Sequence, residues 1–244
     1  MNVSVEALSH VFPGRPPRPA IDEISFHVPS GQFLAIVGPS GCGKSTMLRL
    51  AANLLRPSSG RIHLDGLTPA EAIAKRQIAW MSQSPALLPW LTARANVAMA
   101  GRFLPQGAAR FSPEEALEKV GLADSARAYP FMLSGGMQQR LALARTLTLP
   151  ARLWLMDEPF AALDEITRER LSAELLALWQ PLRPTVLWVT HNLHEAVRLA
   201  DRVLVLSPRP ARVLADLPIR LPRPRDDASR EFIEMVRQLR AVLA

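Results

Sequence analysis

The sequence has little cysteine, lysine or tyrosine, and it has no long hydrophobic run. One of its 244 residues is a cysteine, Cys42, which excludes an internal disulfide. No apolar stretch reaches the roughly 20 residues that a membrane-spanning helix needs. The N-terminus shows no basic region followed by an apolar one, so no secretion signal is predicted. These absences fit a cytosolic protein.

Positive charge comes almost entirely from arginine. The net charge is +7, and Lys44, Lys75 and Lys119 are the only lysines. A basic protein could bind nucleic acid or an anionic membrane surface. Alternatively, the positive charge reflects a genome-wide codon bias toward arginine. No basic block with interleaved aromatic residues is present, so a nucleic-acid partner is not predicted.

Strand and helix patterns alternate along most of the chain. Apolar alternation and short apolar runs predict strands at 2–12, 20–28, 32–37, 61–66, 153–157, 185–191 and 202–207. Helical spacing predicts helices at 45–55, 166–179 and 193–200, and an amphipathic C-terminal helix marked by Phe232, Val236, Leu239 and Leu243. This order predicts a parallel sheet with helices on both faces. A mostly helical stretch at 68–148 interrupts it, and the Pro/Arg-rich stretch 217–227 is an expected extended connector.

GPSGCGKST, residues 38–46, follows a predicted buried strand and precedes a predicted helix. Its first eight residues fit G-x-x-x-x-G-K-[ST], whose glycines let successive N–H groups face one anion. The helix N-terminus adds partial positive charge, Lys44 would reach the outer phosphates, and Ser45 would ligate Mg²⁺. Cys42 inside this loop is either passive or a redox-sensitive thiol.

Polar residues follow three further apolar strands. LWLMDEP places Asp157 and Glu158 at the end of one strand, where open α/β sheets bind ligands. Asp157 suits a magnesium ligand, and Glu158 suits a base that polarises water. His191 ends another strand, where it is either structural or able to approach the same phosphate. Gln83 follows the apolar stretch 78–81 and is either a solvated loop residue or one that orients water and contacts the metal.

A second glycine-rich stretch, LSGGMQQR, lies at 133–140, far from the first. Small residues let backbone N–H groups approach an anion, and a helix start adds a favourable dipole. Together with GPSGCGKST, Gln83, LWLMDEP, the ALD of 162–164 and His191, in this order, it makes nearly the whole chain resemble the ATP-binding subunit of ABC transporters. A simple P-loop kinase would leave LSGGMQQR and His191 unexplained.

The resemblance implies the architecture. We expect an α/β fold with a P-loop NTPase (RecA-like) core and a mainly parallel sheet. An N-terminal antiparallel β subdomain and an inserted helical subdomain at about 84–150 complete it. Residues 1–244 would form one ABC ATPase domain that ends in a C-terminal helix at about 227–244.

The resemblance also implies the ligands, ATP and Mg²⁺, and the residues that serve them. The expected catalytic residues are Glu158, His191 and Gln83. The expected metal ligands are Ser45, Gln83 and Asp157. The residues expected to bind nucleotide are Phe12, Gly38, Pro39, Ser40, Gly41, Cys42, Gly43, Lys44, Ser45, Thr46, Gln83, Ser134, Gly135, Gly136, Gln138 and Asp164, with Phe12 stacking on adenine.

The partners that the resemblance implies explain why one chain has two glycine-rich loops. Two subunits pack head to tail with ATP bound, and Ser134, Gly135 and Gly136 cap the γ-phosphate held by the opposite subunit. The homodimer would sit peripherally on the cytoplasmic face of the inner membrane, bound to integral membrane permease subunits. A periplasmic or extracellular solute-binding protein would act indirectly. The apolar stretch 84–100 is either a docking surface or a buried helical core.

LLPWLTARANV and MDEPFAALDEITR are similar to the importer ATPases for nitrate, sulfonates and taurine, which implies uptake of a small organic or inorganic anion. The alternatives are thiamine-precursor import, lipid transport or export, and a soluble ABC ATPase of DNA repair or translation. The sequence departs from the family pattern at Asn53, Met132, Ala161 and Asn192, and none of these changes removes a catalytic group.

Overall fold

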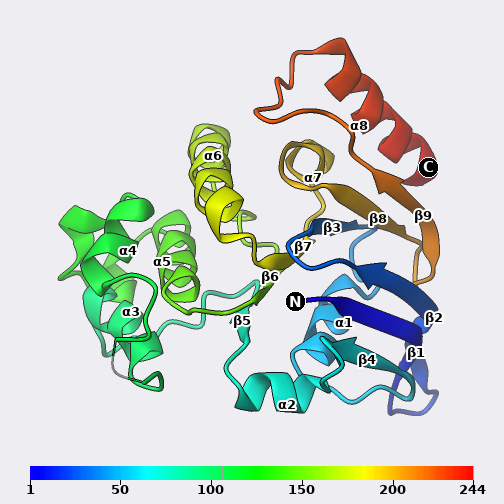
Figure 1. The fold of residues 1–244 in the computed structure, drawn as a ribbon, viewed down its shortest axis with the longest axis horizontal. Coiled ribbons are helices and arrows are strands. Elements are labelled where there is room, and N and C mark those ends of the chain that lie inside the picture. The colour runs from blue at the N-terminus through cyan, green and yellow to red at the C-terminus, as the bar shows by residue number, and fades with distance from the viewer. Residues whose placement is uncertain (106, 244) are drawn as a thin grey trace.

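The computed structural model describes residues 1–105 and 107–243, and it contains two sheets flanked by helices (Figure 1). The first sheet is antiparallel, with strand order β2–β1–β4. Its strands are β1 (Val3–Phe12), β2 (Arg18–Val28) and β4 (Ser59–Leu64). The predicted antiparallel β subdomain is therefore confirmed.

The second sheet carries the strand ends that matter for function. Its order is β5–β6–β7–β3–β8–β9, and the first five strands are parallel to one another. The strands are β3 (Phe33–Val37), β5 (Ile78–Met81), β6 (Leu153–Asp157), β7 (Thr185–Val189), β8 (Arg202–Leu206) and β9 (Val213–Pro218). The predicted mainly parallel sheet is confirmed.

Strand β9 was not predicted. It pairs antiparallel with β8 at the edge of the sheet, and its residues alternate between half-buried and exposed. Because an edge strand lacks the continuous apolar run of a central strand, its sequence resembles a loop. The connector expected at 217–227 consequently begins inside this strand.

The central strands of the parallel sheet are buried on both faces. All five residues of β3, β6 and β7 are buried, which accounts for their uninterrupted apolar runs. Alternate side chains enter two cores, because successive residues of a strand point to opposite faces. Phe33 packs with Trp179 and Trp188 on one face, while Leu34 and Ile36 join the core shared with the antiparallel sheet.

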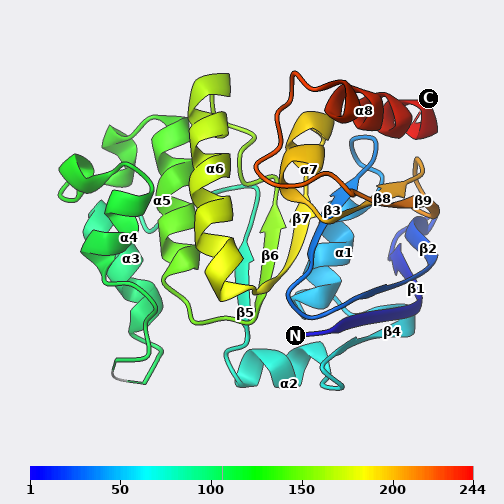
Figure 2. The ribbon, with the colours of Figure 1, turned by 45° about the horizontal axis from the view of Figure 1, so that its top comes forward.

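Helices cover both faces of the parallel sheet (Figure 2). α1 (Lys44–Ala51) lies in the core between the two sheets, and α6 (Glu165–Leu182) and α7 (Leu193–Leu199) lie on the other face. The predicted C-terminal helix is α8 (Arg230–Leu243), which buries Phe232, Val236 and Leu239 beside α7 and β8. α2 (Pro69–Ala74) is short and begins with a capping box at Thr68.

The inserted region forms a helical lobe beside β5 (Figure 1). It contains α3 (Ala93–Gly101), α4 (Pro113–Lys119) and α5 (Gly135–Leu147), with single 3₁₀ turns at Ala123–Ser125 and Pro130–Met132. Thr92, Ser112 and Ser134 cap the three helices through their hydroxyl groups. Loops separate these helices, and the strand β5 lies inside the stretch 68–148 that was predicted to be mostly helical.

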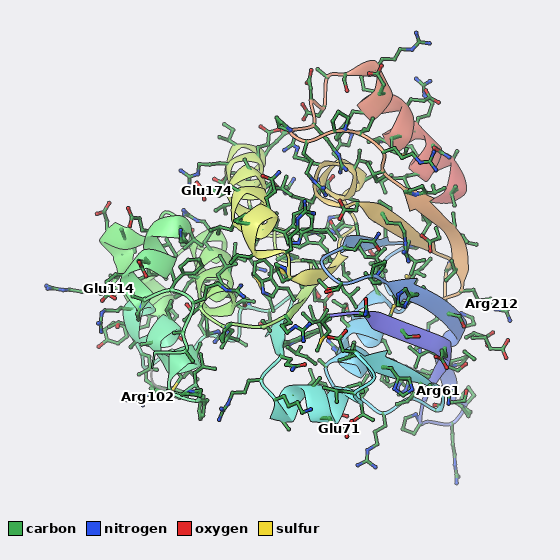
Figure 3. The ribbon with its side chains drawn as sticks, in the orientation of Figure 1. Arg61, Glu71, Arg102, Glu114, Glu174 and Arg212 are labelled. Atoms are coloured by element: carbon green, nitrogen blue, oxygen red, sulfur yellow. The ribbon has the colours of Figure 1, made fainter. Side chains whose placement is uncertain are left out.

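Charged side chains lie mainly at the outside of the molecule, as the labelled Arg61, Glu114 and Arg212 illustrate (Figure 3). No helix within residues 1–105 and 107–243 is both long and apolar enough to cross a bilayer.

Candidate functional site

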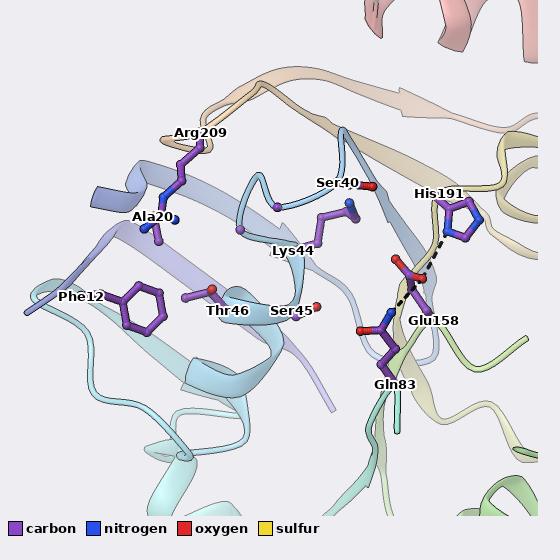
Figure 4. A pocket seen from close by; sticks show the side chains of 12 residues that line it. Phe12, Ala20, Ser40, Lys44, Ser45, Thr46, Gln83, Glu158, His191 and Arg209 are labelled. Atoms are coloured by element: carbon purple, nitrogen blue, oxygen red, sulfur yellow. Dashed lines mark hydrogen bonds and ion pairs between the residues drawn. The ribbon is translucent and has the colours of Figure 1, made fainter. Parts of the chain in front are cut away.

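The strand order brings four predicted site segments to one edge of the parallel sheet. β5, β6, β7 and β3 are consecutive neighbours, so the loops after their carboxyl ends meet. These loops hold Gln83, Glu158, His191 and the phosphate loop, residues 38–45. A cavity of about 430 Å³ lies between them (Figure 4). Its lining residues are Phe12, Ala20, Ser40, Gly41, Gly43, Lys44, Ser45, Thr46, Gln83, Glu158, His191 and Arg209.

The phosphate loop wraps around the start of α1. Gly43 precedes the helix at φ 130°, and an added Cβ there would lie 2.7 Å from the carbonyl oxygen of Ala20, so only glycine fits. No side chain caps α1, which leaves its first N–H groups available to an anion. The Lys44 ammonium donates to the carbonyl oxygens of Gly38 and Pro39 at 2.8 and 2.9 Å. The loop therefore offers backbone N–H groups and one ammonium group, which are donors that suit a phosphate group.

Cys42 is buried in this loop, with 1% of its surface exposed. Reaction with a soluble oxidant requires an accessible thiolate. The structure therefore favours the passive alternative for this thiol.

Two side chains with oxygen atoms that could bind a metal, Ser45 and Asp157, lie side by side at the cavity. The Ser45 hydroxyl donates to the Asp157 carboxylate at 2.8 Å. Burial raises the pKa of Asp157, and the Ser45 hydrogen bond opposes that shift. A hydroxyl and a carboxylate are ligands that Mg²⁺ accepts, and this ion usually completes its shell with phosphate oxygens and waters. The residues present therefore fit a magnesium ion beside a nucleotide.

Glu158 lies at the centre of the polar edge of the cavity. Gln83 Nε2 donates to Glu158 Oε2 at 3.4 Å, and His191 Nδ1 lies 3.2 Å from the same oxygen. Glu158 has φ 48°, a left-handed conformation that costs free energy for a non-glycine residue. Its backbone N–H donates to the Val189 carbonyl at 2.9 Å, which holds this conformation against β7. The sequence-predicted Gln83, Glu158 and His191 are thus brought together.

The loop that carries His191 is fixed by its own side chains. Thr190 accepts from the Asn192 N–H at 3.0 Å, and Asn192 caps α7 by accepting from the Glu195 N–H at 3.1 Å. Asparagine is among the residues that cap helices best, so Asn192 suits this position. The Glu195 carboxylate accepts from Trp188 Nε1 at 2.6 Å, and burial raises the pKa of Glu195.

The opposite end of the cavity has an aromatic wall. Phe12 is half-buried at the end of β1, and His10 packs edge-on against it with ring centres 4.6 Å apart. Ala20 and Arg209 line this end as well, and neither was predicted from the sequence. Arg209 belongs to the turn between β8 and β9, and only the tertiary structure brings that turn to Phe12.

The second glycine-rich loop, the signature loop of residues 133–136, lies apart from this cavity. Ser134 caps α5 by accepting from the Met137 N–H at 3.3 Å, and Ser134 and Gly135 are exposed. Within the described part of the chain, the cavity lining includes none of Ser134, Gly135, Gly136, Gln138 and Asp164. Gln138 instead donates to the carbonyl oxygens of Pro130 and Leu133, and Asp164 caps α6. One chain therefore does not bring both glycine-rich loops to one site.

The ABC transporter family matches residues 21–161. The nitrate import ATP-binding protein of Synechococcus elongatus is 40% identical over 227 residues, which are 91% of this chain and 82% of the relative. The aliphatic sulfonates import ATP-binding protein of Pectobacterium atrosepticum is 44% identical over 228 residues, which are 93% and 83% of the two chains.

Among solved structures, a dimeric ATP-binding cassette in a post-hydrolysis state, bound to ADP and phosphate, superposes with a TM-score of 0.80. It is 30% identical, and the match covers 90% of this chain and all of the other. The cavity geometry, the strand order and these similarities agree with one another, and the chain belongs to the ABC transporter family as an ATP-hydrolysing subunit.

Proposed function

We propose that this chain hydrolyses ATP at a site shared by two copies of itself and so drives uptake of a small anion through a membrane permease. The observation that carries the proposal is that the phosphate loop and Glu158 line the same cavity. We further propose that residues 1–244 act as one ATPase domain, with residues 84–150 as its helical subdomain.

The residues of the cavity divide the chemistry among them. Phe12 stacks on the base, the N–H groups of the phosphate loop and Lys44 hold the phosphates, and Glu158 orients and polarises the attacking water. His191 and Gln83, both within 3.4 Å of the Glu158 carboxylate, keep that carboxylate in place. A magnesium ion held by Ser45, Asp157 and Gln83 would neutralise charge on the transferred phosphoryl group.

The proposed second copy supplies what the cavity lacks. The signature loop is exposed, small and placed at the start of α5, whose N-terminal N–H groups favour an anion. In a head-to-tail dimer, Ser134, Gly135 and Gly136 close over the γ-phosphate of the opposite copy. The matching cassette is dimeric and bound to ADP and phosphate, which supports a dimer of two copies. Closure excludes water from the site, and hydrolysis allows it to reopen.

The proposed permease contact lies between the parallel sheet and the helical lobe. A groove of about 340 Å³ there is lined by Ile73, Arg76, Ile78, Trp80, Ala100, Phe103, Leu104, Arg145, Thr146 and Leu149. Phe103, in the groove, is 70% exposed. Within the stretch 84–100, Trp90 is 69% exposed, while Ala93 and Val97 are buried. The stretch 84–100 thus contributes both to the lobe core and to an apolar surface, which suits a membrane-protein partner.

Arg145 connects this groove to the cavity. Its guanidinium donates to the carbonyl oxygens of Pro85 and Ala86, both at 2.8 Å, in the loop that follows Gln83. Arg145 lies on α5, the helix that begins with the signature loop. A partner that shifts the lobe would therefore move Gln83 and the signature loop together. A chain that binds a permease here works at the cytoplasmic face of the membrane.

The nitrate and sulfonate import relatives support a small anion as the transported solute. The ATPase cavity itself has the chemistry of a nucleotide site, so the solute contacts the permease and its solute-binding protein.

The test is purification of the tagged chain from native membranes solubilised in detergent, followed by mass spectrometry and an ATPase assay. We expect a polytopic membrane protein at a ratio near one to one, and ATPase activity that rises when solute-binding protein and an organic or inorganic anion are added. Lys44→Ala is the matched control, because it removes the phosphate contact while leaving the groove intact. Co-purification of ribosomes or nucleic acid instead of a membrane protein would refute the transporter assignment.

A further inference from the structure

Arg209 enters the nucleotide cavity from an unexpected place. It lies in the turn between β8 and β9, almost two hundred residues from Phe12 in the sequence, yet it lines the same end of the cavity (Figure 4). Its guanidinium carbon lies 6.0 Å from the centre of the Phe12 ring. Phe12 and Arg209 lie at one end of the cavity, and Glu158 and His191 lie at the other, with Lys44 between them (Figure 4).

The turn that carries Arg209 is firmly attached to the antiparallel sheet. The Ala211 N–H donates to the Ala20 carbonyl at 2.9 Å, and the Asp22 N–H donates to the Ala211 carbonyl at 3.0 Å. The Arg209 guanidinium donates to the carbonyl oxygens of Pro19 and Arg18 at 2.7 and 3.1 Å. These bonds fix the edge of the guanidinium and leave its flat faces free of hydrogen bonds, because its donors lie in its plane.

The spacing between the two groups is close to what an inserted base requires. Two successive carbon contacts of about 3.5 Å need roughly 7 Å between the outer layers. A guanidinium plane and an aromatic ring are both groups on which nucleobases stack. The guanidinium carbon lies 6.0 Å from the ring centre, so the two groups need to move apart by at least roughly 1 Å, with their planes turned toward each other, to admit a base between them.

We propose that Arg209 is a nucleotide-binding residue that covers one face of the base while Phe12 covers the other. This inference rests on the proposed role of the phosphate loop, which places the base at the Phe12 end. The arrangement gives stacking on both faces without hydrogen bonds to the base edge, so it strengthens binding of a nucleoside triphosphate with little choice among bases. It also places a positive charge against the base.

The test compares ligands that differ only in the part that Arg209 would contact. Calorimetric titration of the full chain with ATP and with inorganic tripolyphosphate separates base binding from phosphate binding. We expect Arg209→Ala to weaken ATP binding about five- to tenfold, in line with the stacking of one base, and to leave tripolyphosphate affinity within about twofold. Arg212→Ala is the matched control, because Arg212 belongs to the same turn but pairs with Asp22 at the surface.

A second pair of ligands distinguishes direct contact from support of the Phe12 loop. The base of 7-methylguanosine triphosphate carries a fixed positive charge, which the Arg209 guanidinium would repel and the Phe12 ring would attract. We expect the wild-type chain to prefer GTP over the methylated nucleotide. Arg209→Ala should reduce that preference at least threefold, which corresponds to a change of about 0.7 kcal/mol in the difference between the two binding free energies.

Three results would overturn the inference. They are unchanged ATP affinity in Arg209→Ala, an equal loss for ATP and tripolyphosphate, and an equal loss for GTP and its methylated form. A wild-type chain that binds neither ATP nor tripolyphosphate would instead refute the proposed nucleotide site itself.

Discussion

The two glycine-rich loops of this chain look alike in sequence and differ in structure. In the phosphate loop, a Cβ on Gly43 would lie 2.7 Å from a carbonyl oxygen of β2, and the backbone adopts φ 130°. In the signature loop, a Cβ on Gly135 would meet no atom within 4 Å, and φ is not left-handed. The fold of this chain requires the first glycine and does not require the second.

The difference is the one that the proposed dimer requires, because the signature loop is open to a partner outside its own chain. Lys44 is 5% exposed and bonded within its loop, whereas Ser134 and Gly135 lie open at the start of α5. Glycine there exposes backbone N–H groups to whatever approaches. The head-to-tail dimer proposed above provides such a partner in the phosphates of the second copy.

The largest expected effect is on hydrolysis, and it separates ATP hydrolysis from ATP binding. Glu158→Gln removes the proposed base and keeps the size of the side chain, so hydrolysis should fall by about 10²- to 10⁴-fold. ATP affinity should stay within about threefold, since the phosphate loop is intact. Single-turnover hydrolysis and equilibrium binding measure the two quantities. Turnover near that of the wild type would remove Glu158 from the role of base.

A bulky charge in the signature loop tests its action on the second copy. Ser134→Arg should lower hydrolysis about 100-fold, because the side chain blocks the close approach of the two copies. Affinity of the single subunit for ATP should not change, since Ser134 lies outside the cavity. Ser134→Asp is a matched variant that keeps the helix cap and should also stop hydrolysis by repelling phosphate. A large loss of single-subunit affinity would show that the loop acts within its own chain.

Replacing Gly43 or Gly135 by alanine tests whether the two glycine-rich loops differ in their effect on stability. Gly43→Ala should lower the free energy of unfolding by about 1–3 kcal/mol, because it adds both strain and a clash with Ala20. Gly135→Ala should leave stability unchanged or raise it by about 0.4–1 kcal/mol, because its conformation accepts a side chain. Chemical unfolding of both variants provides the measurement. Equal destabilisation would contradict the distinction between the loops.

The smallest expected effect concerns the buried carboxylate beside the phosphate loop. Burial raises the pKa of Asp157 above 3.8, so the folded chain binds this proton more tightly than the unfolded chain does. Stability of the nucleotide-free protein therefore falls as the pH rises from 3.8 through the folded pKa. Asp157→Asn should raise the denaturant concentration at the unfolding midpoint at pH 7, and this gain in stability should disappear below pH 3.8. A gain that is independent of pH would show that charge burial is not the cause.

Much of the candidate site was predictable because its motifs are local. The phosphate loop, LWLMDEP and His191 each follow a short apolar strand, and the carboxyl ends of parallel strands share one edge. The strand β9 could not be recognised, since an edge strand has no uninterrupted apolar run. Arg209 could not be recognised either, because SPRPARV has the pattern of an ordinary surface turn.

The sequence by itself determined the family, the parallel sheet, and the residues that follow its strands, because these depend on short patterns and on their order. The tertiary structure alone decided the strand order β5–β6–β7–β3, which places Gln83 and His191 beside the Glu158 carboxylate. It also decided that the β8–β9 turn faces Phe12 and that the signature loop lies away from its own cavity. Such juxtapositions come from the packing of segments far apart in the chain, which no local pattern encodes.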